Sequence, residues 1–242
     1  MKSMMQCVKY QYRQFLLSTK YILPTILYAC LIGFMFSIKP VFVVSIFSLM
    51  SLFLFLFMVI ISALCQDLEP EVSEQILILR MQSARKYYYS RILFLATLCG
   101  LTALVSLAYP LLLHYLQGRS MFTRDIVGMD IVGGFLLMFL GSFVGCMVGS
   151  FFSPRAVRDP NKRILLTVIA ASLSVVRIAL VAELPFTRFF LWIVPPISDL
   201  IAWFTKEEYF RPGRLFTACL ILLLYGIALA MIQVELSRSR KF

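Results

Sequence analysis

The chain alternates long apolar stretches with short charged segments, and six of the apolar stretches have the length of a membrane span. They cover residues 21–38, 41–65, 92–116, 131–152, 164–182 and 215–234. A helix needs roughly 17 to 25 residues to cross about 30 Å of hydrocarbon. These stretches are apolar on every face, whereas a surface helix of a soluble protein has one apolar stripe. The pattern predicts an all-α membrane protein with six transmembrane helices, organised as one domain over residues 1–242.

Composition supports a membrane protein. Of the 242 residues, 61% are hydrophobic and 14% charged, which leaves too little polar surface for a soluble globule of this size. The net charge of +11 comes from basic residues beside the spans and not from a basic stripe interleaved with aromatics, so we expect no nucleic-acid partner. The six cysteines are dispersed without a CxxC motif, which predicts apolar fillers and neither a disulfide framework nor a metal site.

The basic residues also predict an orientation. Six spans place both termini on one side, and that side carries 15 Lys and Arg residues against 7 on the other. Because Lys and Arg near span ends accumulate in the cytoplasm, both termini are predicted to be cytoplasmic. We expect a multi-pass protein of the cell membrane, of the bacterial plasma-membrane type.

Residues 186–204 are apolar enough to be taken for a seventh span. Pro195 and Pro196 divide this stretch into two pieces too short to cross, because prolines interrupt helical hydrogen bonds. We therefore expect a re-entrant or interfacial hairpin on the outer side, with Trp192 and Trp203 shaping a pathway there. The alternative, a true crossing, would export the basic C-terminal tail against the charge rule.

Residues 2–20 precede the first span and form an amphipathic pattern. On a helical wheel Lys2, Lys9, Arg13 and Lys20 gather on one side, and apolar residues share a neighbouring face. This pattern predicts an interfacial helix in contact with membrane lipids. The alternative is a basic topology signal with some helicity.

The segment between the second and third spans has organised charges. Acidic residues come first and basic residues last, which suits a helix dipole, so we expect a short helix from Glu71 to Gln82. Ser83 is then expected to cap a second helix that runs into the third span. The apolar side chains of residues 76–81 need a cover, which is either the membrane surface or a partner protein.

These features together resemble the type-2 ATP-binding-cassette (ABC) exporter permeases. In that family the cytoplasmic segment carries an acidic residue, an apolar turn, Pro-x-Ser-Arg, an aromatic and a basic residue. The matching residues here are 74–79, Ser83-Ala84-Arg85 and 88–91, with Gln82 in place of the proline and no Gly-Thr pair before the apolar turn. The resemblance implies a coupling helix over residues 71–85 that contacts an ATPase subunit through Glu71, Glu74, Gln75, Ile78, Met81, Gln82, Ser83 and Arg85.

The resemblance also implies the partners and the cargo. A separate cassette-type ATPase would bind ATP and Mg²⁺, and this chain would bind no cofactor and catalyse no reaction itself. A second permease chain, identical or paralogous, would complete a transport path. The cargo would be amphipathic or hydrophobic, such as a peptide, a lipid-like molecule or a drug-like compound, moved out of the cell.

Two intramembrane features carry open alternatives. Gly141, Gly145 and Gly149 are spaced by four and clear one helix face, either for packing inside the chain or for a dimer contact. Arg177 lies within a span, where arginine is costly. It is expected to snorkel, or else to pair, for example with Glu183 or Asp199, or to line a cavity.

No catalytic pattern appears. The single histidine, His114, has no carboxylate or cysteine array beside it, and the sequence contains no HExxH, GxSxG or Gly-rich phosphate-binding loop. The rival functions are an ion-coupled carrier and an intramembrane enzyme acting on lipid or protein. The carrier would normally show acidic residues near midspan, which these spans lack.

Overall fold

The structure is a computed structural model, and it describes residues 2–37, 39–69, 71–118, 121–154, 157, 159–184, 186–187, 191, 194–205 and 207–239. The helices are α1 (Lys2–Leu17), α2 (Ile22–Met35), α3 (Val43–Gln66), α4 (Glu71–Met81), α5 (Ala84–Leu116), α6 (Gly128–Phe151), α7 (Pro160–Glu183), α9 (Ile197–Phe204) and α10 (Pro212–Ser239). Within this described part, a single bridge between Val41 and Phe122 is the only strand-like pairing. The all-α prediction is confirmed.

Five helices (α3, α5, α6, α7 and α10) are long and apolar enough to cross a membrane, and the number is six if α1 and α2 form one bent span. This set is consistent with a multi-pass membrane protein. The first predicted span is shorter than expected: α2 has 14 residues, or about 21 Å, against a hydrocarbon core of about 30 Å. A turn at residues 18–21 separates it from α1, and the two helices meet at 80°.

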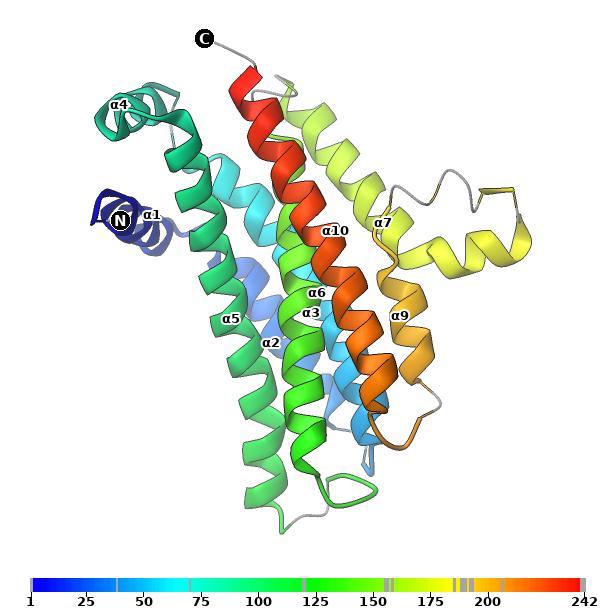
Figure 1. Cartoon of the computed structure of the whole chain (residues 1–242). Helices are drawn as coiled ribbons and strands as arrows, with labels where there is room; N and C mark the ends of the chain where they lie inside the picture. The colour runs from blue at the N-terminus through cyan, green and yellow to red at the C-terminus, as the bar shows by residue number, and fades with distance from the viewer. Residues whose placement is uncertain are drawn as a thin grey trace.

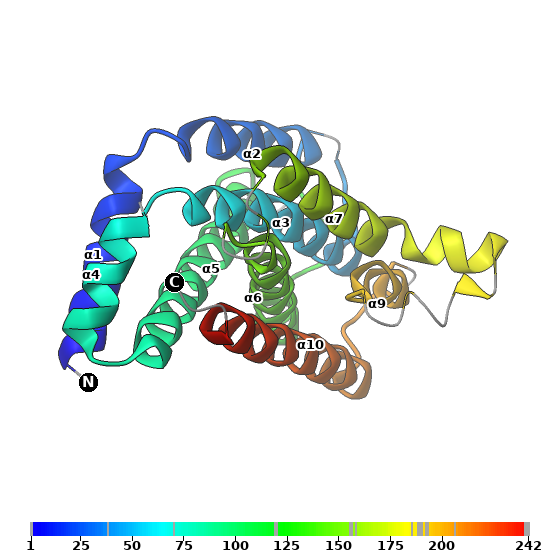
Figure 2. The same ribbon diagram turned by 90° about the horizontal axis from the view of Figure 1, so that it is seen from above.

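Helices α3 and α6 form the centre of the bundle, with α2, α5, α7, α9 and α10 around them (Figure 2). The glycines of α6 allow this close approach. A Cβ added at Gly145 would lie 2.4 Å from the Phe55 carbonyl oxygen, and one at Gly149 would lie 2.2 Å from that of Val59. Gly141 likewise faces Ser51. The small residues therefore pack within one chain, which was the first of the two alternatives.

Helices α1 and α4 lie across the bundle axis, near the end of the bundle where α10 ends (Figure 1). The apolar face of α1 is directed inward: Val8 and Phe15 are buried, and Tyr12 stacks edge-on against Phe94 at 4.8 Å. Met5, which shares this face on a helical wheel, is instead exposed. The opposite end of the bundle carries the connections between α2 and α3 and between α5 and α6 (Figure 1).

The region before α10 departs from a simple up-and-down arrangement. Figure 1 shows that the last part of α7 points away from the bundle. Helix α9 lies against the bundle again, next to α10. Helix α9 begins directly after Pro196 and buries Ile197, Leu200 and Phe204. The second arm of the predicted hairpin is thus a packed eight-residue helix. Most of the first arm, including Trp192, lies outside the described residues.

Candidate functional site

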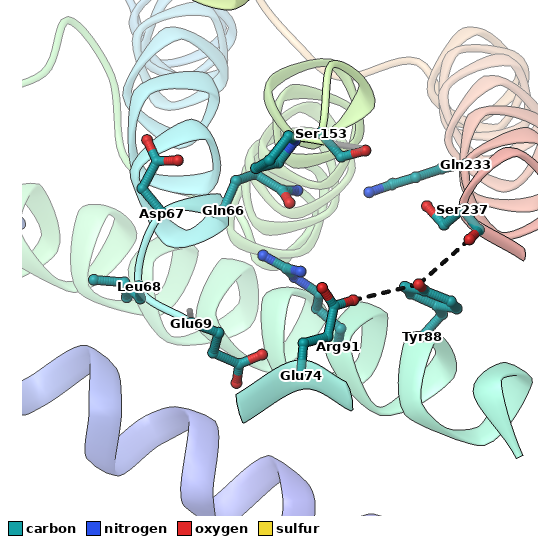
Figure 3. A pocket seen from close by; sticks show the side chains of 11 residues that line it. Gln66, Asp67, Leu68, Glu69, Glu74, Tyr88, Arg91, Ser153, Gln233 and Ser237 are labelled. Carbon is teal, nitrogen blue, oxygen red and sulfur yellow. Dashed lines mark hydrogen bonds between the residues drawn. The ribbon is translucent and has the colours of Figure 1, made fainter. Parts of the chain in front are cut away.

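A polar layer lies beneath α4. Its contacts involve five helices of the bundle, namely α3, α5, α6, α7 and α10. A cavity of about 300 Å³ lies there. Its lining side chains are mainly polar and come from α4, α5, α10, the end of α3 with the segment that follows it, and the segment after α6 (Figure 3). Because polar groups in a dry interior are costly unless they are bonded, such a layer requires a function or a compensating network. The contacts described below provide that network.

Helix α4 forms where the charge pattern predicts it and ends one residue earlier than expected, at Met81. Gln82 follows with φ of 53°, in the left-handed region that terminates helices, and its N–H donates to the Leu79 carbonyl at 3.1 Å. Proline cannot adopt this φ, because its ring fixes the angle near −65°. The turn between α4 and α5 therefore has a backbone conformation at Gln82 that the proline of the family pattern could not adopt.

Glu74 connects α4 to the long helix α5 and, through α5, to α10. Its side chain is turned inward and buried, and the Tyr88 hydroxyl of α5 lies 3.3 Å from its Oε1. The same hydroxyl lies 3.4 Å from the Ser237 carbonyl oxygen of α10 (Figure 3). A displacement of α4 therefore acts on α5 directly and on α10 through the Tyr88 hydroxyl.

A partly buried arginine lies behind this contact. Arg91 of α5 donates from Nη2 to the Cys65 carbonyl at 3.1 Å, and the carboxylates of Glu69 and Glu74 lie near enough to interact with its charge. Glu69 also accepts a hydrogen bond from the Tyr87 hydroxyl. Nearby opposite charge and hydrogen bonds of this kind lower the cost of placing a guanidinium inside the bundle. The arrangement fastens the segment after α3 to the start of α5.

Two further groups of hydrogen bonds extend the layer to α6 and α7. The amides of Gln66 and Gln233 both donate to the Ser150 carbonyl oxygen, at 3.1 and 2.9 Å, which joins α3, α6 and α10. Arg163 of α7 holds both carboxylate oxygens of Asp67 at 2.6 and 2.8 Å. Every long helix of the bundle thus has a polar contact in this layer.

The residues predicted to contact an ATPase do not share one face of α4. Glu74 and Met81 are buried toward the bundle, Ile78 packs beside Met81, and Gln82 and Arg85 are exposed. The residues that the structure leaves exposed on α4 include three apolar ones, Val72, Ile76 and Leu79. Gln75 is half-buried, and the side chain of Glu71 lies outside the described part.

Ser83 stands at the position before α5, as predicted, with extended backbone. Its side chain, however, makes no capping hydrogen bond. The expected cap is therefore present in backbone position only. Helix α5 is nevertheless continuous for 33 residues from Ala84, as the sequence predicted for a helix running into the third span.

Arg177 is paired with an acidic residue. Its Nε lies 3.2 Å from the Asp199 carboxylate, and its Nη1 donates to the Val194 carbonyl at 3.0 Å. The Arg177 side chain is 11% exposed. Of the two partners expected for a paired Arg177, the structure shows Asp199. The pair joins α7 to α9, whereas Trp203 of α9 is exposed at 41%.

Sequence reasoning missed a second charged cluster at the other end of the bundle. Arg124 binds both carboxylate oxygens of the buried Asp130, at 2.7 and 2.9 Å, and also donates to the Glu208 carbonyl. Its guanidinium lies 4.0 Å from the centre of the Tyr209 ring. Hydrogen bonding to Asp130 raises the pKa of Arg124. The sequence signal that could have indicated this cluster was Asp130, an acidic residue directly before the predicted span at 131–152.

The described residues contain no group of three or more His, Cys, Asp or Glu side chains able to hold a metal ion. His114 is buried against the Phe122 ring, with the two ring centres 5.0 Å apart. The cysteines are all free.

No protein-family model, curated protein or solved structure matches this chain. A function is therefore inferred from the contacts described above.

Proposed function

We propose that this chain is the membrane-spanning subunit of an ATP-driven exporter of the type-2 ABC class, with α4 as the contact for a separate ATPase subunit. The observation that carries the proposal is the two-sidedness of α4. The inward-facing Glu74 is hydrogen-bonded to Tyr88 of α5, whose hydroxyl also reaches Ser237 of α10, and the outward face of α4 is apolar and exposed.

The outward face consists of Val72, Ile76 and Leu79, which are 66%, 59% and 76% exposed. At 100° per residue these three side chains fall within about 60° of one another. Met81 and Leu77 lie on the opposite side, where they join a cluster with α1, α5 and α10. An apolar triplet on so short a helix needs a cover.

The position of α1 favours a protein as that cover. Helix α1 lies below α4 at the edge of the bundle, so α4 is farther than α1 from the depth at which the long helices would meet lipid (Figure 1). Lys9 and Arg13 of α1 are exposed, as expected of a helix in the headgroup layer with its charges toward water and anionic lipid. In this arrangement both termini and α4 are cytoplasmic. The outward face of α4 then points to the cytosol.

The mechanism follows from the polar layer. Closure of the ATPase on ATP and Mg²⁺ would push α4, and the contacts of Glu74 with Tyr88 would pass the motion to α5 and α10. Such a transition needs two discrete packings whose balance the nucleotide changes. Exposed apolar side chains on α2, α7 and α10 offer a surface on which a second permease chain could pack. The cargo would be amphipathic or hydrophobic.

One observation favours a different class. The Arg177–Asp199 pair is an ionisable couple between helices of the bundle, which is where proton-coupled carriers place their relays. An ion-coupled carrier is therefore the alternative. Its transport would stop when the ion gradient is collapsed and would continue without ATP, whereas the exporter would behave in the opposite way.

Purification in mild detergent tests the proposal. We expect a stoichiometric cassette-type ATPase to accompany the wild-type chain and to be lost from the Ile76→Glu/Leu79→Glu variant. Gln6→Glu, which adds a charge on exposed α1 beside the same end of the bundle, is the matched control and should retain the ATPase. Absence of any ATPase from the wild-type preparation, or its full retention by the double variant, would overturn the assignment.

A further inference from the structure

We propose that a groove between α3 and α7 binds one acyl chain of a phospholipid, with a phosphoethanolamine headgroup held by Asp67 and Arg163. The polar end of the site lies at the same end of the bundle as α4, and the site is separate from the contact surface of α4. It does not depend on the ATPase partner, so it can be tested on this chain alone.

The groove has a volume of about 440 Å³ and a mostly apolar lining. That volume falls within the range of about 300 to 1,000 Å³ that is usual for ligand sites. The hollow exists because several lining positions carry small side chains, among them Ala63 of α3 and Ala171 and Ser172 of α7. Larger side chains at these positions would close it.

The groove is placed to receive a chain from the bilayer. Its walls continue into α7 residues that are themselves exposed and apolar, including Ile164 and Val168, which are 60% and 54% exposed. An apolar hollow that opens among lipid-facing side chains is filled by hydrocarbon and not by water, because water finds no partners there. The occupant is therefore an alkyl or acyl chain.

The polar end of the groove specifies the headgroup. Asp67 and Arg163 both line it, and both hydrogen bonds between them use the same nitrogen, Nη2 of Arg163. The other guanidinium N–H groups are not used by these bonds, and Asp67 is 39% exposed. A site with one cation and one anion at hydrogen-bonding distance complements a headgroup that carries both charges.

Phosphoethanolamine fits this pair better than other common headgroups. Its phosphate accepts hydrogen bonds from the guanidinium, and its ammonium donates to a carboxylate. Phosphocholine has no N–H with which to reach Asp67. An anionic headgroup would gain from Arg163 but would be repelled by Asp67.

Photolabelling tests the site. The full chain is placed in phosphatidylcholine nanodiscs with a trace of phosphatidylethanolamine that bears a diazirine at the end of one acyl chain. We expect labelling to concentrate on the α3 and α7 residues that line the groove. The substitution Ser172→Phe should reduce it by about five-fold, because the phenyl ring occupies the groove.

A matched variant controls for general effects of added bulk. Ala179 is also exposed on α7 and does not line the groove, so Ala179→Phe should leave the labelling unchanged. Labelling spread evenly over α2, α7 and α10, or labelling that persists in Ser172→Phe, would show annular lipid only and overturn the proposal.

The headgroup is tested by exchanging the probe. In the wild type, phosphatidylethanolamine should label more strongly than phosphatidylcholine or phosphatidylglycerol carrying the same diazirine chain. In Asp67→Asn the order should reverse in favour of phosphatidylglycerol, because Arg163 is then unneutralised. A folding defect would lower all three probes together and could not produce this reversal. Equal labelling by all three probes in the wild type would contradict the headgroup assignment.

Discussion

The Tyr88 hydroxyl lies 3.3 Å from the Glu74 carboxylate, and this contact joins the short helix α4 to the long helix α5. The same hydroxyl reaches the Ser237 carbonyl of α10. A hydroxyl has a single proton to donate, so it can favour one acceptor or the other. A shift of α4 that moves Glu74 would therefore change the hydrogen bond between Tyr88 of α5 and Ser237 of α10.

Removing that hydroxyl should weaken coupling without unfolding the chain. In Tyr88→Phe the ring still packs, and the loss of hydrogen bonding to a carboxylate costs about 1.5 to 3 kcal/mol at most. We expect the ATPase to remain bound and its activity to respond less to cargo. The measurement is ATP hydrolysis by the reconstituted complex with and without cargo. Tyr89→Phe removes the hydroxyl of an exposed neighbour and should behave as the wild type; an equal loss there would contradict the role of Tyr88.

Cysteine labelling measures the orientation of the chain. In a background without the six native cysteines, Ser83→Cys should react with an impermeant maleimide only after the cytoplasmic side is exposed. Asp125→Cys, at an exposed position at the opposite end of the bundle, should react in intact cells. The reverse pattern would place α4 outside and end the proposed coupling to an ATPase.

The Arg177–Asp199 pair predicts a coupling energy between two substitutions. Arg177→Gln or Asp199→Asn alone should destabilise by about 1 to 3 kcal/mol, because each leaves a charge without its partner in a largely buried place. The double variant should be less destabilised than the sum of the two. Unfolding in detergent, followed by the loss of helical signal, gives the three values. Simple additivity would mean that the two charges do not interact.

Gly145 predicts the cost of separating α3 from α6. An added methyl group would meet the Phe55 carbonyl at 2.4 Å, so Gly145→Ala should destabilise by about 1 to 3 kcal/mol through overpacking. Gly33→Ala is the control, since a methyl group added there would have nothing within 4 Å, and it should be neutral or stabilising. Melting temperatures in detergent compare the two. Similar values would argue against a tight α3–α6 contact.

Most helices follow local signals and were predictable. The predicted helix at 71–82 appears as Glu71–Met81, and the predicted span at 41–65 appears as Val43–Gln66. Hydrophobic length, charge order and proline positions are properties of neighbouring residues, and they act before any tertiary contact forms. The first of the six predicted spans agrees less well with the structure, because α2 is only 14 residues long and is bent sharply from α1.

The sequence by itself determined that the chain is helical with several stretches long and apolar enough to span a membrane, where α4 lies along the chain, and that Arg177 would need an explanation. The tertiary structure alone decided that Asp199 supplies it, that Glu74 faces inward while Ile76 faces outward, and that Arg163 meets Asp67. Hydrophobic periodicity acts over a few residues, so it fixes an element and its length. Which polar side chains meet depends on how helices far apart in the chain cross, and no local pattern contains that information.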